Sequence, residues 1–207
     1  MSLVEQIAQA DERGLAASGL ACLDRCLPLL GGDDELLRPL WARLADGSDW
    51  SGDLSRVHET LGSATPSTPS VPSTPSDSSD DEAARLARRM LESAPAERTA
   101  DAVRPWADAC SLASLRIHRL LDPAADDGPA PDGGPVPADV DAGRAGDTAD
   151  LPPLVAAELR RQAAVLELLA GHGAQGLRRA LEVSVEGRRV LRAVVSRRAR
   201  SAAEPGA

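Results

Sequence analysis

The sequence predicts an all-α protein, a helical bundle of about eight helices joined by two long disordered linkers. Apolar residues recur at helical spacing along most of the 207-residue chain. No segment combines sustained alternation of polar and apolar residues with enrichment in β-branched residues, the pattern typical of strands. Glycines and prolines lie mainly between the periodic stretches, where they end helices. Together these observations favour helices throughout.

Residues 1–62 are predicted to form a smaller helical unit, either docked on the rest of the chain or tethered to it. The opening segment Ser2-Leu3-Val4-Glu5 is an S-x-x-E capping box, so a helix should begin there. We expect helices over about 3–13 and 15–29, with a weak point at Gly14. Two shorter amphipathic helices follow, with apolar stripes at Leu36, Leu37, Leu40, Trp41 and Leu44 and at Trp50, Leu54, Val57 and Leu61.

Two stretches lack the large apolar residues that a core needs and are predicted to be disordered linkers. Residues 63–82 are rich in Ser, Thr and Pro and end in acidic residues. Residues 122–150 are rich in Asp, Pro, Gly and Ala. Neither composition buries enough apolar surface to offset the entropy lost on ordering. The tail, 201–207, is expected to be disordered as well.

Residues 83–200 are predicted to form a four-helix bundle that contains the acidic insertion at 122–150. Prolines and glycines again separate the periodic segments, and acidic residues stand at several predicted helix starts, where they complement the helix dipole. The expected helices cover about 80–94, 99–121, 151–170 and 175–200.

The amino-acid composition carries a bias that limits what the basic residues can mean. Lys, Asn, Phe and Tyr are absent, and all 23 Lys and Arg positions are Arg, a usage typical of a high-GC bacterium. The abundance of Arg therefore does not by itself indicate phosphate recognition. The net charge of -9 argues against general attraction of the chain to nucleic acid or to an anionic membrane.

The chain is expected to be a soluble cytoplasmic protein. Its first residues lack the basic region and continuous apolar run of a signal peptide. No stretch is apolar over the roughly 20 residues that a membrane span needs. Cys22, Cys26 and Cys110 are odd in number and lack the spacing of a disulfide framework, which favours free thiols in a reducing compartment.

The string from Gly171 to Gly176 matches the G-x-G-x-x-G fingerprint of dinucleotide-binding turns. That motif needs a strand before it and an acidic residue about 20 positions further on, but a helical pattern precedes it here, and Ser196 stands at the later position. We therefore predict a turn between two antiparallel helices, 151–170 and 176–200, and no bound cofactor. An anion at the start of the second helix is the alternative.

No metal site and no catalytic residues are predicted. Cys22 and Cys26 lie on one helical face and could supply two thiolate ligands, but zinc sites use four. The three histidines, His58, His118 and His172, are scattered and belong to no known catalytic motif. A ligand-binding or catalytic site inside the bundle, lined by His118 or Cys110, is an alternative that sequence cannot locate.

The C-terminal helix carries the densest group of basic residues, including Arg188, Arg189, Arg192 and Arg200. Such a stripe could bind phosphates or another anion, so a nucleic-acid-associated regulator is one alternative function. The chain has few aromatic residues to stack on bases, which argues against single-stranded nucleic acid. Pairing of these arginines with the acidic linkers of the same chain is the other interpretation.

The leading hypothesis is a non-enzymatic interaction or regulatory protein, which acts through protein–protein interaction. Amphipathic helices without a recognisable catalytic or metal-binding motif favour this function over an enzyme. Tryptophan is common at binding hot spots, so Trp41, Trp50 and Trp106 are the predicted partner-binding residues, above all any that proves exposed. The partner and the oligomeric state are left open.

Overall fold

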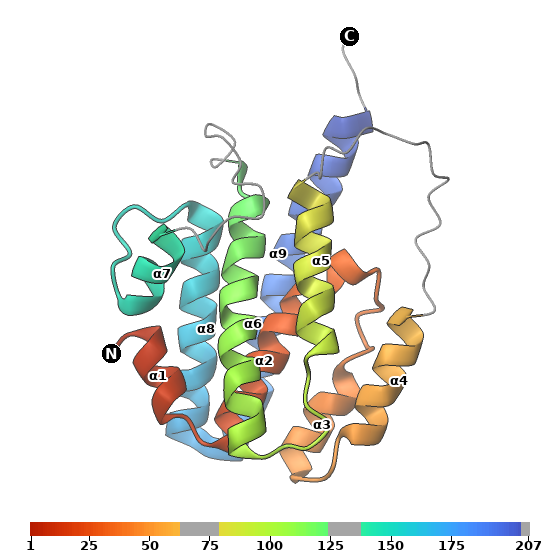
Figure 1. Cartoon of the computed structure of the whole chain (residues 1–207), viewed down its shortest axis with the longest axis vertical. Helices are drawn as coiled ribbons and strands as arrows, with labels where there is room; N and C mark the ends of the chain where they lie inside the picture. Colours follow the sequence, from red (N-terminus) through yellow and green to blue (C-terminus); the bar gives the residue numbers. More distant parts are fainter. Residues whose placement is uncertain (63–78, 124–137, 204–207) are drawn as a thin grey trace.

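The computed structural model describes residues 1–62, 79–123 and 138–203 (Figure 1). Every regular element within these ranges is helical, which confirms the predicted all-α class. The single-turn 3₁₀ segments η1 and η3 adjoin the longer helices. The elements are α1 (Leu3–Gln9), α2 (Glu12–Cys26), η1 (Leu27–Leu30), α3 (Arg38–Asp46), α4 (Ser51–Gly62), α5 (Ser79–Glu92), α6 (Ala100–Leu120), α7 (Ala138–Ala145), α8 (Pro153–His172), η3 (Gly173–Gly176) and α9 (Leu177–Ala203).

The two predicted linkers lie largely outside the described residues, as does most of the predicted tail. The described part of the first linker range already belongs to α5. Within the second, 122–150, the prediction was too wide because Ala138–Ala145 form α7. Arg144 of α7 forms an ion pair with Asp108, and Val140 is 1% exposed. This helix has one large apolar residue, so its position depends on contacts with α1, α6 and α8 that no local pattern shows.

The first helix ends earlier than the sequence predicts. The capping box is present, since the Glu5 amide donates to the Ser2 hydroxyl and the Ser2 amide donates to the Glu5 carboxylate. The break before α2 falls at Asp11 instead of Gly14, because the Asp11 carboxylate accepts from the Gly14 amide at 2.7 Å and caps α2. α2 then ends at Cys26, and a 3₁₀ turn replaces the predicted helical residues that follow.

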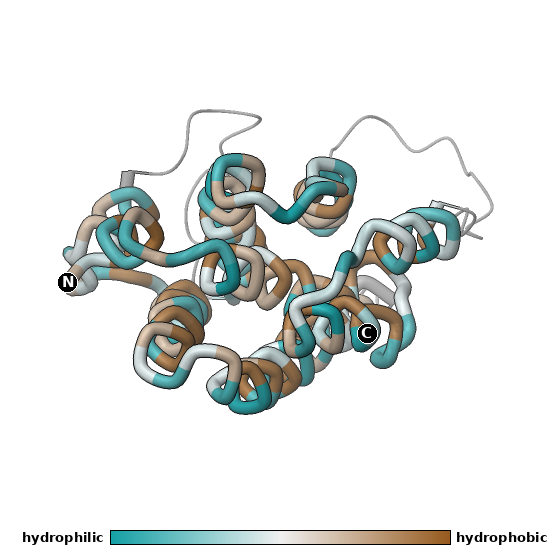
Figure 2. Tube along the Cα trace, turned by 90° about the horizontal axis from the view of Figure 1, so that it is seen from below, coloured by the Kyte–Doolittle hydropathy of each residue, from teal (hydrophilic) through white to brown (hydrophobic). Residues whose placement is uncertain are grey.

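Helix α2 lies at the centre of the molecule and packs against α6, α8 and α9 (Figure 1). It is buried on nearly all sides, from Gly14 to Cys26. Residues of 1–62 and residues of the predicted four-helix bundle thus belong to one hydrophobic cluster. Figure 2 shows apolar residues concentrated on the helix sides that face one another. Helices α2 and α6 approach closely at Gly19, where an added Cβ would lie 2.5 Å from the Trp106 ring.

The glycine string joins α8 to α9, which run antiparallel (Figure 1). Residues 151–176 contain no strand, so the predicted helix–helix turn is confirmed. The roles of the glycines differ in detail from the prediction, because α8 continues through Gly171 to His172. Gly173 has φ of 52°, which favours glycine. Gly176 is required by space, since an added Cβ would lie 2.3 Å from the carbonyl oxygen of Leu168.

The variants Gly176→Ala and Gly171→Ala test these roles. Gly176→Ala is expected to lower the free energy of unfolding by about 1–3 kcal/mol, because the methyl group meets backbone that cannot move independently. Gly171 is an exposed helical residue with open space around it. Gly171→Ala is therefore expected to be neutral or to stabilise by up to about 1 kcal/mol. Urea denaturation of both variants measures the difference, and equal effects would contradict the packing argument.

Candidate functional site

The three tryptophans predicted to bind a partner lie in the core. Trp41, Trp50 and Trp106 are 4%, 1% and 4% exposed. The indole nitrogens of Trp50 and Trp106 donate to the carbonyl oxygens of Pro95 and Met90, and the two rings pack edge to face with centroids 5.8 Å apart. Because their apolar area is buried within the chain, these side chains offer no surface to a partner in this structure.

The four α9 arginines predicted to bind an anion divide into two groups. Arg188 forms an ion pair with Asp24 of α2, and Arg192 forms one with Asp34. Arg188 is only 5% exposed, so half of the predicted anion-binding stripe holds α9 to the N-terminal part of the chain. Arg189 and Arg200 are exposed and form no ion pair within the described residues. Asp24 and Asp34 lie outside the acidic linkers that the sequence analysis connected with these arginines, whereas Arg198 of α9 pairs with Asp80 from the predicted first linker range.

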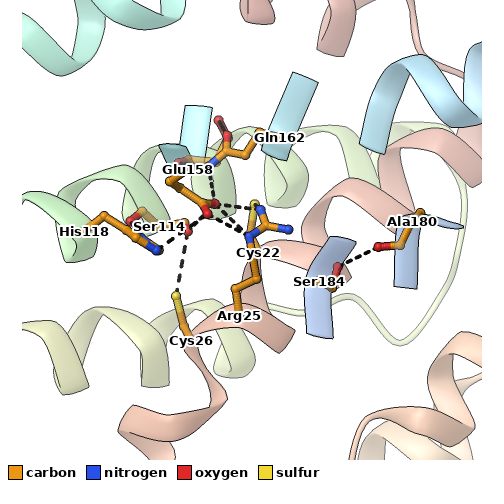
Figure 3. A network of polar contacts seen from close by, with 10 residues as sticks. Cys22, Arg25, Cys26, Ser114, His118, Glu158, Gln162, Ala180 and Ser184 are labelled. Atoms are coloured by element: carbon orange, nitrogen blue, oxygen red, sulfur yellow. Dashed lines mark hydrogen bonds and ion pairs between the residues drawn. The ribbon is translucent and has the colours of Figure 1, made fainter. Parts of the chain in front are cut away.

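A buried ion pair that the sequence analysis missed lies between α2 and α8 (Figure 3). The Arg25 guanidinium and the Glu158 carboxylate are both 0% exposed and meet through two parallel hydrogen bonds, Nε to Oε2 at 2.8 Å and Nη2 to Oε1 at 2.6 Å. Burial by itself would raise the pKa of Glu158, but the adjacent Arg25 charge outweighs it and lowers this pKa to about 2. Both groups are therefore charged at neutral pH.

Polar side chains from α6 and α8 complete the surroundings of Glu158 (Figure 3). The Ser114 hydroxyl and the Gln162 amide donate to its Oε1 at 2.8 and 2.9 Å. His118 places Nδ1 2.7 Å from the Ser114 carbonyl oxygen, which can only accept, so Nδ1 carries a proton. Its Nε2 lies 3.6 Å from the Glu158 carboxylate without a hydrogen bond. The network joins three helices, and Arg25 Nη1 and His118 Nε2 are its buried atoms without a hydrogen-bond partner among the described residues.

The cysteines contribute buried thiols to the same region. Cys22, Cys26 and Cys110 are all free and 0% exposed. Burial raises the pKa of the Cys22 thiol to about 12 and also raises the pKa of the other two. Thiols held protonated in this way are poor nucleophiles. Within the described ranges, no three His, Cys, Asp or Glu side chains are grouped so as to hold a metal ion.

An apolar groove with basic edges lies between α5 and α6, which face the viewer in Figure 1. Its cavity volume is about 220 Å³. Arg89 of α5 and Arg116 of α6 flank it, and neither forms an ion pair within the described part of the chain. None of its lining residues is acidic. Apolar side chains form most of the remaining lining, namely Leu86, Met90, Ala109, Leu112 and Ala113.

The local sequence explains this groove, although the sequence analysis did not single it out. The apolar stripe of α5, which includes Leu86 and Met90, packs on α6 and leaves Leu112 half-buried at the edge. Arg89 and Arg116 come next to those stripes in their helices, so they stand where the apolar surface meets solvent. The signal for the groove in the sequence was an arginine that borders the apolar stripe of an amphipathic helix. Many surface arginines have such a position, so this signal does not single out Arg89 and Arg116.

Comparison with known proteins gives no family model, no curated protein and no solved structure that matches this chain. Among the described helices, none is both long enough and apolar enough to span a membrane. Function therefore has to be inferred from the residues of this chain.

Proposed function

We propose that this chain is a non-enzymatic cytoplasmic protein that binds an amphipathic helix of a protein partner in the α5–α6 groove. The observation that carries the proposal is the combination of an apolar floor with two arginines, Arg89 and Arg116, that have no ion pair to any residue the structure describes. Amphipathic helices bind such grooves by inserting apolar residues at helical spacing. The partner helix should carry Asp or Glu beside its apolar face, opposite the two arginines.

Charge complementarity supports an acidic partner helix. The chain as a whole has a net charge of -9, so a groove without a lining carboxylate differs from the average surface. Exposed ion pairs add little affinity, about 0.2–1 kcal/mol each, but they orient the partner and raise the association rate. Burial of the apolar floor supplies most of the affinity in this proposal.

The alternative functions have less support. Of the four α9 arginines predicted to bind nucleic acid, only Arg189 and Arg200 are available, since Arg188 and Arg192 are paired with carboxylates of the same chain. A catalytic role for His118 or Cys110 is disfavoured because both are buried and the cysteine thiol is held protonated. These observations favour a protein partner over the other two classes.

The groove is tested with the charge-reversed variant Arg89→Glu/Arg116→Glu and a matched control, Arg189→Glu/Arg200→Glu. Wild-type protein captures partners from a lysate of the native host, and affinities for a captured protein are then measured with purified components. We expect the groove variant to bind roughly tenfold or more weakly, because like charges now face the acidic helix. The control should bind as wild type does.

Hydrogen exchange locates the contact. Binding should slow exchange in 86–93 and 109–116, the α5 and α6 segments that line the groove. Equal loss in both variants, or protection confined to α9, would contradict the proposal. Binding of duplex DNA at low salt that is lost only in the α9 variant would support the nucleic-acid alternative instead.

A further inference from the structure

A second cleft lies between α1 and α8, which are neighbours in Figure 1. Its cavity volume is about 450 Å³, within the range of small-molecule sites. Leu166, Leu169 and Ala170 of α8 form an apolar wall. This cleft shares no lining residue with the α5–α6 groove, so it is independent of the proposed function.

The polar groups of the cleft favour a positive charge. Asp11 and Glu167 line it, and neither carboxylate forms an ion pair within the described ranges. No basic side chain lines the cleft, and the terminal amino group near it belongs to Met1, a lining residue that is 75% exposed. The C-terminal end of α8 also reaches the cleft at Gly173, and the last carbonyl groups of a 20-residue helix carry partial negative charge. The cleft therefore attracts a cation from two sides.

Gln6 provides an independent indication of a ligand. Its side chain lines the cleft and is only 8% exposed. The amide nitrogen donates to Glu167 Oε1 at 3.4 Å, whereas the amide oxygen has no donor. A buried acceptor without a partner is costly, because it has lost its hydrogen bonds to water and gained none in exchange. A donor placed between Gln6 and Glu167 would satisfy both groups.

We propose that the α1–α8 cleft binds a small organic cation, a primary ammonium group attached to an apolar body. The ammonium group donates to Gln6 Oε1 and to the Glu167 carboxylate, with Asp11 adding negative charge. The apolar body lies on Leu166 and Leu169. An ammonium group fits better than a bare metal ion, because it supplies the donor that Gln6 lacks and leaves an apolar wall for its carbon chain. A free amine and the lysine side chain of a peptide share this chemistry.

Calorimetric titration with hexylammonium chloride tests the site, with hexanol and sodium hexanoate as probes of similar apolar size without the positive charge. We expect saturable binding of hexylammonium at least tenfold tighter than that of hexanol, and weaker binding at high salt. Nα-acetyl-lysine amide is titrated in parallel. Tighter binding of this compound assigns the cleft to a peptide lysine, and tighter binding of hexylammonium assigns it to a free amine.

Two substitutions remove charge while the fold is kept. Asp11→Asn retains the helix cap of α2, since Asn caps as well as Asp does. Glu167→Gln changes an exposed residue. Each should weaken hexylammonium binding about fivefold or more, whereas the control Glu182→Gln, in the neighbouring α8–α9 groove, should not. Absence of binding, equal binding of hexanol, or an equal effect of the control would overturn the proposal.

Discussion

Replacing Glu158 with Leu is expected to lower the free energy of unfolding by about 3–5 kcal/mol, the largest single effect that we predict. The substitution leaves the Arg25 guanidinium charged and 0% exposed, with no carboxylate beside it. It also removes the acceptor of the Ser114 and Gln162 hydrogen bonds. A domain of this size is stabilised by only about 5–15 kcal/mol, so the variant should be close to unfolding at moderate urea concentration.

The double variant Arg25→Met/Glu158→Leu separates the charge from the packing. Removing both partners eliminates the unpaired charge and replaces it with apolar groups of similar size, which is often neutral or stabilising. We expect the double variant to recover most of the stability lost in Glu158→Leu, as measured by urea denaturation. If it is as unstable as the single variant, shape and hydrogen bonding matter more here than charge compensation.

The shifted pKa values of Glu158 and His118 predict how the free energy of unfolding depends on pH. The folded-state pKa of Glu158, about 2, lies below the unfolded value, so its contribution is present above about pH 4.5 and lost as the pH falls towards 2. The contribution is on the order of 3 kcal/mol. Burial also lowers the pKa of His118, so the folded state loses stability as the pH falls below about 6.5. The double variant should show a smaller loss than wild type between pH 4.5 and 2.

Replacing Gly19 with Ala is expected to destabilise the protein by about 1–3 kcal/mol, although alanine is the better helix former. The added Cβ would lie 2.5 Å from the Trp106 ring, well inside contact distance. The ring cannot move away easily, because its indole nitrogen donates to the Met90 carbonyl oxygen and the ring packs edge to face with Trp50. The overlap should therefore outweigh the gain in helix propensity, which is about 1 kcal/mol.

Gly52→Ala is the matched control, since Gly52 is an exposed glycine of α4 with open space around it. This substitution should leave stability unchanged or raise it by a few tenths of a kcal/mol. The combination Gly19→Ala/Trp106→Leu adds a coupling test. Its cost should be smaller than the sum of the two single costs, because the smaller side chain makes room for the methyl group. Strict additivity would show that the two residues do not compete for space.

Features that depend on neighbouring residues were predictable from the sequence. The capping box of Ser2 and Glu5 and the turn from Gly171 to Gly176 follow from backbone hydrogen bonds within a few positions. The all-α class follows from periodicity within each helix. The break at Asp11 was harder to predict, since Asp11 and Gly14 both offer local reasons for a helix to end.

The candidate sites depended on which helices meet. The α5–α6 groove and the α1–α8 cleft exist only where faces of two helices approach each other. Sequence reasoning instead pointed to Trp41, Trp50 and Trp106, because large aromatic residues serve equally well in cores and at interfaces. Their burial became evident only from the contacts of Trp50 with Trp106 and of both with backbone carbonyls.

The sequence by itself determined the helical class, most helix positions and the turn between α8 and α9, because hydrogen bonds and periodicity act over a few residues. Only the tertiary structure decided the central position of α2 and the pairing of Arg25 with Glu158, which are 133 positions apart. It also decided that Arg188 and Arg192 pair within the chain. Such partners are chosen by packing of the whole core, where burial makes an unpaired charge costly and a distant partner necessary.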